Sequence, residues 1–166
     1  MFKPAADFRA LVADRSVHMA GLIGEMLRSL KIRLVDEAHD LAAVEKAISS
    51  QVYHLVLLDA ALAPGDDLGL VHKLRLAEEH PNRNVPIIMM AGTPSASMIT
   101  TARDAGVNEF LRKPFAAQHI ALRMEAIQAS PREFVTVDSY VGPDRRRRTV
   151  AGAPHRRAAD TSKQTA

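Results

Sequence analysis

The sequence predicts an α/β fold, a doubly wound sheet of five parallel strands covered by five helices. Over residues 8–129, short apolar segments alternate with segments whose apolar residues recur at helical spacing. Strands that alternate with helices in this way pair in parallel, and the helices form the crossovers. Two of the apolar segments, 52–58 and 85–90, are near-continuous runs. Such runs are typical of parallel strands buried on both faces.

Each expected element has its own signal. Strand-like segments stand at residues 8–13, 32–35, 52–58, 85–90 and 109–112. Apolar positions at helical spacing predict helices over residues 19–30, 41–48, 70–77, 98–105 and 120–127. Asp40 can cap the second helix, Gly106 can end the fourth, and Pro131 closes the fifth.

Composition excludes several classes of protein. The chain has 166 residues, 47% of them hydrophobic and 25% charged, which suits one soluble domain with an extension. It has no cysteine, so disulfides and thiolate metal sites are excluded. No apolar run approaches the ~18 residues of a membrane-spanning helix, and the N-terminal segment lacks the apolar core of a secretory signal. We therefore expect a cytoplasmic protein without membrane insertion.

The net charge of +3 is unevenly distributed. Residues 140–166 hold seven Lys and Arg and two acids, whereas the rest of the chain holds 15 bases and 17 acids. The basic pI near 9.5 therefore belongs to the C-terminal segment. A basic tail on a mildly acidic body predicts an anionic partner for the tail and not for the domain.

Two carboxylates mark a candidate site. Asp14 and Asp59 each stand at the carboxyl end of an expected strand. Ligands of doubly wound sheets bind at the carboxyl ends of the strands, near the point where the strand order reverses. We therefore expect the two aspartates to belong to one functional site.

With these aspartates, the chain resembles the receiver domain of CheY-like response regulators. Asp14 after the first strand, Asp59 after the third and Lys113-Pro114-Phe115 after the fifth stand in that family's order, and the resemblance covers roughly residues 8–129. It implies a flavodoxin/CheY-like sheet with strand order 2-1-3-4-5. It also implies phosphoryl transfer from a phosphohistidine to an aspartate.

The resemblance assigns roles to individual residues. Asp59 matches the phosphoacceptor, and Asp14 together with Asp59 matches the carboxylates that hold Mg²⁺, an ion that needs hard oxygen ligands. Lys113 matches the lysine that holds the product phosphate. Ala91 and Phe110 stand at the two switch positions, which in the family carry a hydroxyl residue and an aromatic residue.

Three departures from the family pattern concern the chemistry. Arg15 replaces the second of two adjacent acids, Ala91 lacks the hydroxyl (although Thr93 is close by), and Ala61, whose carbonyl would ligate the metal, lies in a loop one residue longer than expected. A cation at position 15 repels Mg²⁺ and could pair with Asp59. We expect phosphorylation to be impaired or absent, and weak phosphotransfer stays open.

The C-terminal extension carries a second motif. We take residues 1–129 as the receiver domain and 130–166 as an arginine-rich extension, and we expect 151–166 to be disordered. In the segment 140–148, Gly-Pro-Asp is turn chemistry, so the arginines are expected to emerge from a fixed bend. Arginine pairs bidentately with phosphate or with the guanine O6/N7 edge and stacks on bases.

This extension is similar to that of the CheY-like cyclic di-GMP effectors, the Cle group, which act at the flagellar motor. The similarity implies that cyclic di-GMP binds here. The expected ligand-binding residues are Tyr140, Asp144, Arg145, Arg146, Arg147, Arg148, Arg156 and Arg157. A polybasic tail that binds anions or nucleic acid non-specifically is the alternative.

The expected function is signalling and not enzymatic turnover, because fewer than 40 residues follow the fifth helix and leave no room for an output domain. Output is then protein contact through the face of the fourth helix, fifth strand and fifth helix. The resemblance implies a flagellar motor switch or other motility protein as partner, a histidine kinase as a further partner, and recruitment to the flagellated pole. An ordinary phosphorelay receiver with a non-specific tail is the alternative. The seven histidines show no metal-binding spacing.

Overall fold

The computed structural model describes residues 2–62, 67–129, 134–137 and 140–143. Five strands form one parallel sheet, in the order β2-β1-β3-β4-β5. This confirms the predicted fold class and strand order. The strands are β1 Arg9–Ala13, β2 Leu34–Ala38, β3 Leu55–Asp59, β4 Ile87–Ala91 and β5 Glu109–Arg112. The helices are α1 Val17–Ser29, α2 Leu41–Ser50, α3 Asp67–Leu76, α4 Ala96–Ala105 and α5 Ala117–Ala129.

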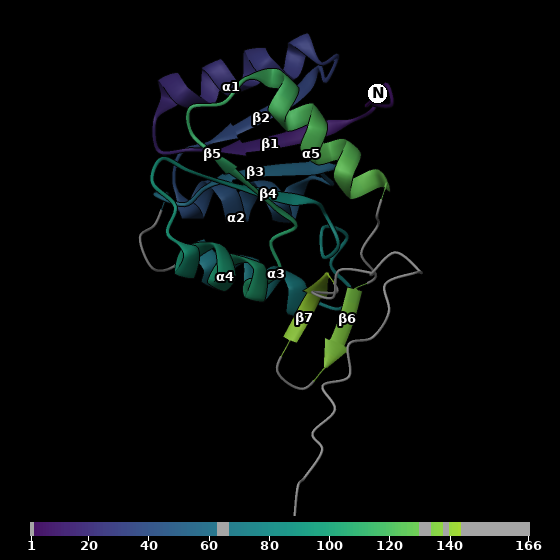
Figure 1. Ribbon diagram of the computed structural model, residues 1–166. Coiled ribbons are helices and arrows are strands. Elements are labelled where there is room, and N and C mark those ends of the chain that lie inside the picture. The colour runs from purple at the N-terminus through teal and green to yellow at the C-terminus, as the bar shows by residue number, and fades with distance from the viewer. Residues whose placement is uncertain (1, 63–66, 130–133, 138–139, 144–166) are drawn as a thin grey trace, which may run out of the picture.

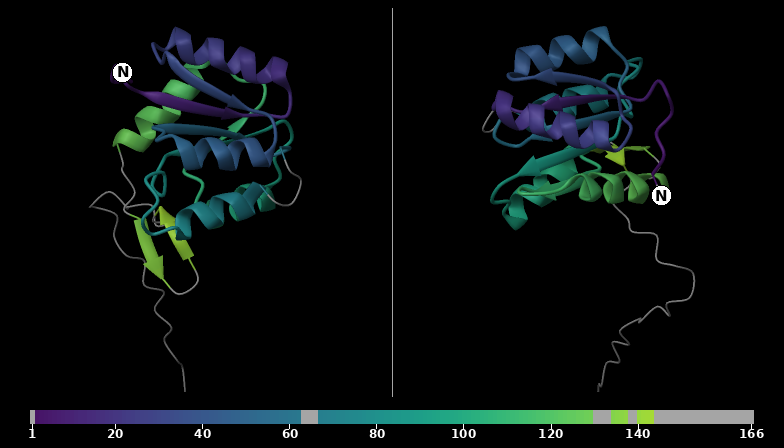
Figure 2. Two further views of the ribbon diagram at one scale, coloured as in Figure 1. Left: turned by 180° about the vertical axis from the view of Figure 1, so that it is seen from behind. Right: turned by 90° about the horizontal axis from the view of Figure 1, so that it is seen from above.

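The helices cover both faces of the sheet, as Figures 1 and 2 show. One core packs α1 and α5 against one face and includes Ile23, Leu27 and Ile120. The other packs α2, α3 and α4 against the opposite face. The central strands β3 and β4 are buried along their whole length, which explains their near-continuous apolar sequence.

The helix ends follow local chemistry. The side chains of Ser16, Asp40 and Ser95 accept hydrogen bonds from the first turns of α1, α2 and α4. Gly106 ends α4 with a φ of 105°, in the left-handed region that glycine adopts without strain. The expected caps at Asp40 and Gly106 are therefore confirmed.

Several strand boundaries differ from the prediction, among them the starts of β2, β3 and β4. β2 begins at Leu34 and not at Ile32, because the amide of Ile32 donates to the carbonyl of Leu27 and so belongs to the turn that ends α1. β3 begins at Leu55 and not at Val52, whose side chain is exposed. In each case an apolar residue that precedes the strand had been counted as part of it.

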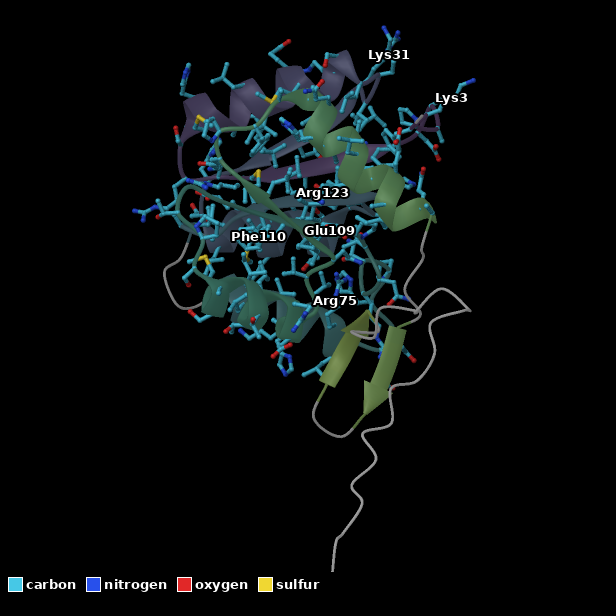
Figure 3. All side chains as sticks on the ribbon, in the orientation of Figure 1. Lys3, Lys31, Arg75, Glu109, Phe110 and Arg123 are labelled. Atoms are coloured by element: carbon cyan, nitrogen blue, oxygen red, sulfur yellow. The ribbon has the colours of Figure 1, made fainter. Side chains whose placement is uncertain are left out.

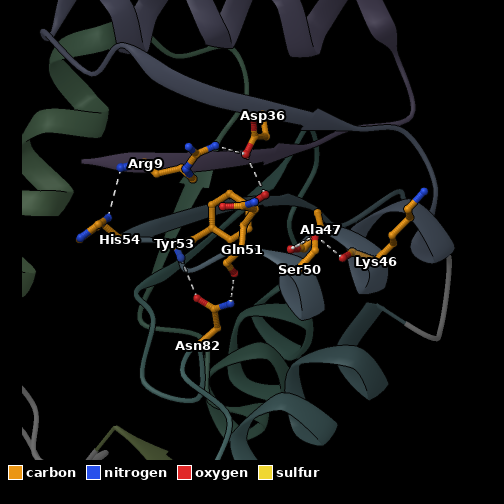
Figure 4. A network of polar contacts seen from close by, with 9 residues as sticks. All are labelled: Arg9, Asp36, Lys46, Ala47, Ser50, Gln51, Tyr53, His54 and Asn82. Carbon is orange, nitrogen blue, oxygen red and sulfur yellow. Dashed lines mark hydrogen bonds and ion pairs between the residues drawn. The ribbon is translucent and has the colours of Figure 1, made fainter. Parts of the chain in front are cut away.

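A buried polar network replaces the expected start of β3 (Figure 4). The buried amide of Asn82 accepts from the backbone N–H of Tyr53 at 2.7 Å and donates to the carbonyl of Gln51. It also donates to the carbonyl of Ile48. The phenol of Tyr53 donates to Asp36 at 2.9 Å. Burial, and then this hydrogen bond, raise the pKa of Tyr53 well above its ordinary value. The network fixes the approach to β3 by hydrogen bonds.

The extension contains an unpredicted hairpin. Strands β6 Phe134–Val137 and β7 Tyr140–Pro143 pair in antiparallel fashion and form a separate two-stranded sheet. Gly142 and Pro143 therefore lie in a strand and not in the expected turn, whose third residue, Asp144, lies outside the described residues. Pro143 is the last residue of β7, a position where the missing N–H of proline is tolerated. Among the described residues, no helix is long and apolar enough to cross a bilayer.

Candidate functional site

The sheet brings Asp14 and Asp59 together at its carboxyl edge. Asp14 directly follows β1, Asp59 ends β3, and the two strands are neighbours. Both side chains are nearly inaccessible, with residue exposures of 2% and 6%. The two carboxylates therefore lie at the same edge of the sheet, as their positions at strand ends predict.

Lys113 binds both aspartates. Its Nζ lies 2.6 Å from Asp14 Oδ2 and 3.2 Å from Asp59 Oδ1. Lys113 follows β5, and its backbone N–H donates to the carbonyl of Ala91 at the end of β4, which fixes where its side chain starts. The other oxygen of Asp14, Oδ1, accepts from the backbone N–H of Ser16 at 2.9 Å. Both carboxylate oxygens of Asp14 are thus engaged.

Arg15 lies beside the cluster of Asp14, Asp59 and Lys113, which we call the aspartate pocket. Its exposed guanidinium donates to the carbonyl oxygen of Ala61 at 3.5 Å. Within the described part of the chain it forms no ion pair with Asp59, so the suggested pairing is not observed; Lys113 neutralises that carboxylate instead. The carbonyl that Arg15 contacts is the one expected to ligate a metal.

The two switch positions differ in environment. Ala91 is buried at the end of β4 and carries no hydroxyl, while Thr93 is exposed two residues later. Phe110 in β5 is partly buried and packs against the core on the α2–α3–α4 face. Phe110 is therefore placed where a change at α4 can reach it.

Sequence reasoning missed one residue at the pocket. His39, which follows β2, forms a hydrogen bond of 2.9 Å through Nδ1 with the backbone carbonyl of Asp14. Because β2 is the other neighbour of β1, the same strand-end argument that selected Asp14 and Asp59 also applies to His39. This contact fixes the backbone at Asp14.

Arg15 and Lys113 weaken this site for Mg²⁺. The ion requires several hard oxygen ligands in near-octahedral geometry. Here the oxygens of Asp14 are taken by Ser16 and Lys113, and a permanent cation contacts the carbonyl of Ala61. No group of three or more His, Cys, Asp or Glu that could hold a metal ion occurs in the described residues. The pocket is a carboxylate pair neutralised by the protein's own cations.

The comparison with known proteins decides the family. Residues 10–125 match the family model of the response regulator receiver domain. The chain belongs to the response regulator receiver family. Receiver domains are generally signalling domains without enzymatic turnover, they interact with histidine kinases, and they typically bind Mg²⁺ at acidic residues near the phosphorylation site. The metal site of this receiver departs from that pattern.

Similar proteins include chemotaxis proteins. The chain is 30% identical over 120 residues to chemotaxis protein CheY1 of Helicobacter pylori, covering 72% of this chain and 95% of that protein. It is 24% identical over 124 residues to the probable chemotaxis protein CheY of Rhizobium etli, covering 74% and 94%. It is 33% identical over 87 residues to the swarming motility regulation protein RssB of Serratia marcescens, but covers only 38% of that protein's length and 52% of this chain.

Solved structures show the same fold. A two-component response regulator from Clostridium difficile superposes with a TM-score of 0.65 at 23% identity, over 76% of this chain and all of the other. A response regulator from Burkholderia pseudomallei gives a TM-score of 0.61 at 22% identity, over 78% of each chain. At this identity the likeness establishes the fold alone.

Proposed function

We propose that this receiver domain acts by protein contact, and that an arginine-rich extension binding cyclic di-GMP controls it in place of phosphorylation of Asp59. One observation carries the proposal: the guanidinium of Arg15 contacts the carbonyl of Ala61, the oxygen expected to ligate a metal ion. Phosphoryl transfer to Asp59 relies on a metal ion to neutralise charge on the phosphoryl oxygens, and Arg15 places a fixed cation at one of the expected metal ligands. Control then has to enter elsewhere in the chain.

The surface of α4, β5 and α5 is the proposed output face. Ile99 in α4 and Leu122 in α5 are exposed large apolar side chains, at 42% and 59%. In β5, Phe110 is partly buried and Glu109 forms an ion pair of 3.6 Å with Arg123 of α5 (Figure 3). Apolar side chains beside ion pairs are typical of a protein-binding surface.

The proposed partner of this face is a flagellar motor switch protein or another motility protein. The names of the similar proteins, two of chemotaxis and one of swarming motility, support this choice. The same partner would recruit a cytoplasmic protein to the flagellated pole. The face is tested by binding assays with Ile99→Asp and Leu122→Asp, against Val52→Asp as an exposed apolar control outside the face. Partner binding that survives both face variants would exclude this surface.

The ligand proposal rests on residue chemistry, because Asp144–Arg148, Arg156 and Arg157 lie outside the described residues and only the backbone of Tyr140, in β7, is described. Cyclic di-GMP carries two guanines and two phosphates. Arginine can pair with both groups, and the Asp144 carboxylate can accept from the guanine N1–H and N2–H edge. Each charge-assisted hydrogen bond contributes about 1.5–3 kcal/mol, and the entropy lost on binding offsets part of this.

Titration calorimetry at two salt concentrations tests the ligand. We expect fixed stoichiometry, preference for cyclic di-GMP over GMP and cyclic di-AMP, and loss of binding when Arg145–Arg148 are changed to Ala. A control variant removes the same charge from four exposed side chains of the domain, namely Lys3, Arg33, Lys46 and Lys73. Binding that collapses with salt, ignores the base and falls equally in both variants would leave only a polybasic tail.

The second candidate is an ordinary phosphorelay receiver, which the burial of Asp59 beside Lys113 favours. Incubation with acetyl phosphate and Mg²⁺, followed by intact mass measurement, separates the two functions. We expect little phosphorylation of the wild type and more in Arg15→Asp. Rapid, stoichiometric gain of one phosphoryl group on wild-type Asp59, absent from Asp59→Asn, would establish the second candidate.

A further inference from the structure

The β6–β7 hairpin lies on the receiver domain at the end far from the aspartate pocket. β7 packs against α3 and α4. Figures 1 and 2 both show the hairpin beside these helices, at the end of the domain where the parallel strands begin. Asp14 and Asp59 stand at the opposite end, where β1 and β3 stop. The hairpin thus reaches α4, one element of the output face, without passing through the pocket.

One buried side chain joins the elements that support the hairpin. Arg75 in α3 is fully buried, and Figure 3 shows it at the end of α3 nearest the hairpin. Its guanidinium donates to the carbonyls of Gly106 at 3.1 Å, Val85 at 2.9 Å and Arg83, and to Asn108 Oδ1 at 3.1 Å. Several directed donors on one rigid group fix the relative positions of these segments.

The partners of Arg75 lead to the output face. Gly106 ends α4, and Asn108 immediately precedes β5. Asn108 Oδ1 also accepts from the backbone N–H of Ile87 at 2.9 Å, which ties the starts of β4 and β5 together. Phe110 follows two residues after Asn108. Displacement of α3 or α4 by the hairpin would therefore reach Phe110 through hydrogen-bonded neighbours.

We propose that the β6–β7 hairpin is a coupling arm, which transmits the ligand state of the arginine segment through α3, α4 and Arg75 to the α4–β5–α5 face. Chain connectivity supports this, because the arginine segment begins directly after Pro143, the last residue of β7. A ligand bound to that segment acts on a strand that already packs against α3 and α4. The identity of the ligand rests on the proposed function, whereas the docking of the hairpin does not.

Docking is tested in the full chain without ligand, by hydrogen exchange in the double variant Val135→Pro, Thr136→Pro. Successive residues of an antiparallel pair alternate in donating across the ladder, so two adjacent prolines remove at least one cross-strand donor from β6. We expect about tenfold faster exchange over residues 74–77 and 102–110, with β1 and β3 unchanged. The matched control is Ala158→Pro, Thr161→Pro. Unchanged exchange at 102–110, or an equal change in the control, would overturn the proposal.

Coupling is tested by adding cyclic di-GMP while calorimetry measures its binding. In the wild type, we expect the ligand to change exchange over residues 102–110. In the hairpin variant, whose arginine segment is intact, we expect binding without that change. Asn108→Ala keeps the hairpin but removes an acceptor of Arg75, so the ligand effect at β5 should shrink. Equal ligand effects in all three proteins would refute coupling. If no ligand binds, the proposed ligand is wrong, and the exchange comparison without ligand alone decides whether the hairpin acts on the face.

Discussion

Replacement of Arg15 by aspartate tests the account of the pocket most directly. The substitution removes the cation from the carbonyl of Ala61 and adds a third carboxylate beside Asp14 and Asp59. Three carboxylates and a carbonyl are the hard oxygen ligands that Mg²⁺ requires. We expect this variant to bind Mg²⁺ much more tightly than the wild type. Because the measurement reports metal binding alone, it needs no phosphodonor.

The size of the effect follows from linkage. Mg²⁺ supplied at ~10 times its dissociation constant stabilises the folded state by about 1.4 kcal/mol. For a domain of this size that corresponds to a rise in Tm of about 5 °C. Thermal unfolding of Arg15→Asp should therefore shift by about 5 °C on addition of Mg²⁺, and that of the wild type by less than about 1 °C.

Arg15→Ala separates the two effects of the substitution, since it removes the cation without adding a ligand. We expect an Mg²⁺ shift between those of the wild type and Arg15→Asp. KCl at matched ionic strength controls for general screening. A wild type stabilised by Mg²⁺ as strongly as Arg15→Asp would show that Arg15 leaves the metal site open, and the argument against phosphorylation would fail with it.

Three further predictions concern stability. Lys113→Met leaves two buried carboxylates without their cation and should lower the free energy of unfolding by about 3 kcal/mol, measured in urea at pH 7. Adding Asp14→Asn should restore part of that free energy, and additive losses in the double variant would contradict an energetic coupling between Lys113 and Asp14. Asn82→Ala leaves the Tyr53 amide without its acceptor and should lower the free energy of unfolding by about 3 kcal/mol. The control Asn84→Ala, at an exposed position, should lower it by less than about 0.5 kcal/mol. Because the pKa of Tyr53 is raised in the folded state, the stabilisation contributed by its neutral phenol is fully present below pH ~10 and lost as the pH rises further. From pH 8 to pH 11, the urea midpoint should therefore fall less in Tyr53→Phe than in the wild type.

The sequence alone determined the architecture and the placement of the pocket's acids and lysine. Alternating strands and helices permit a parallel, doubly wound sheet, and such a sheet brings the carboxyl ends of its strands to one edge. Asp14, Asp59 and Lys113 each follow or end a strand, so their convergence needed no knowledge of side-chain positions. The caps at Asp40 and Gly106 were equally local, because a helix end is satisfied by its own neighbours.

Only the tertiary structure decided which contacts these groups make. Whether Arg15 would meet Asp59 or the carbonyl of Ala61 depends on distances across two loops, which no sequence spacing fixes. Arg75 stands four residues after Val71, on the apolar face of α3, yet its burial depends on acceptors contributed by α4 and by the segments before β4 and β5. The β6–β7 hairpin was missed because its strands have four residues each, and so short a pair gains most of its stability from the helices it packs against. Local patterns specify elements and their ends, whereas long-range packing selects the partners of long, flexible side chains.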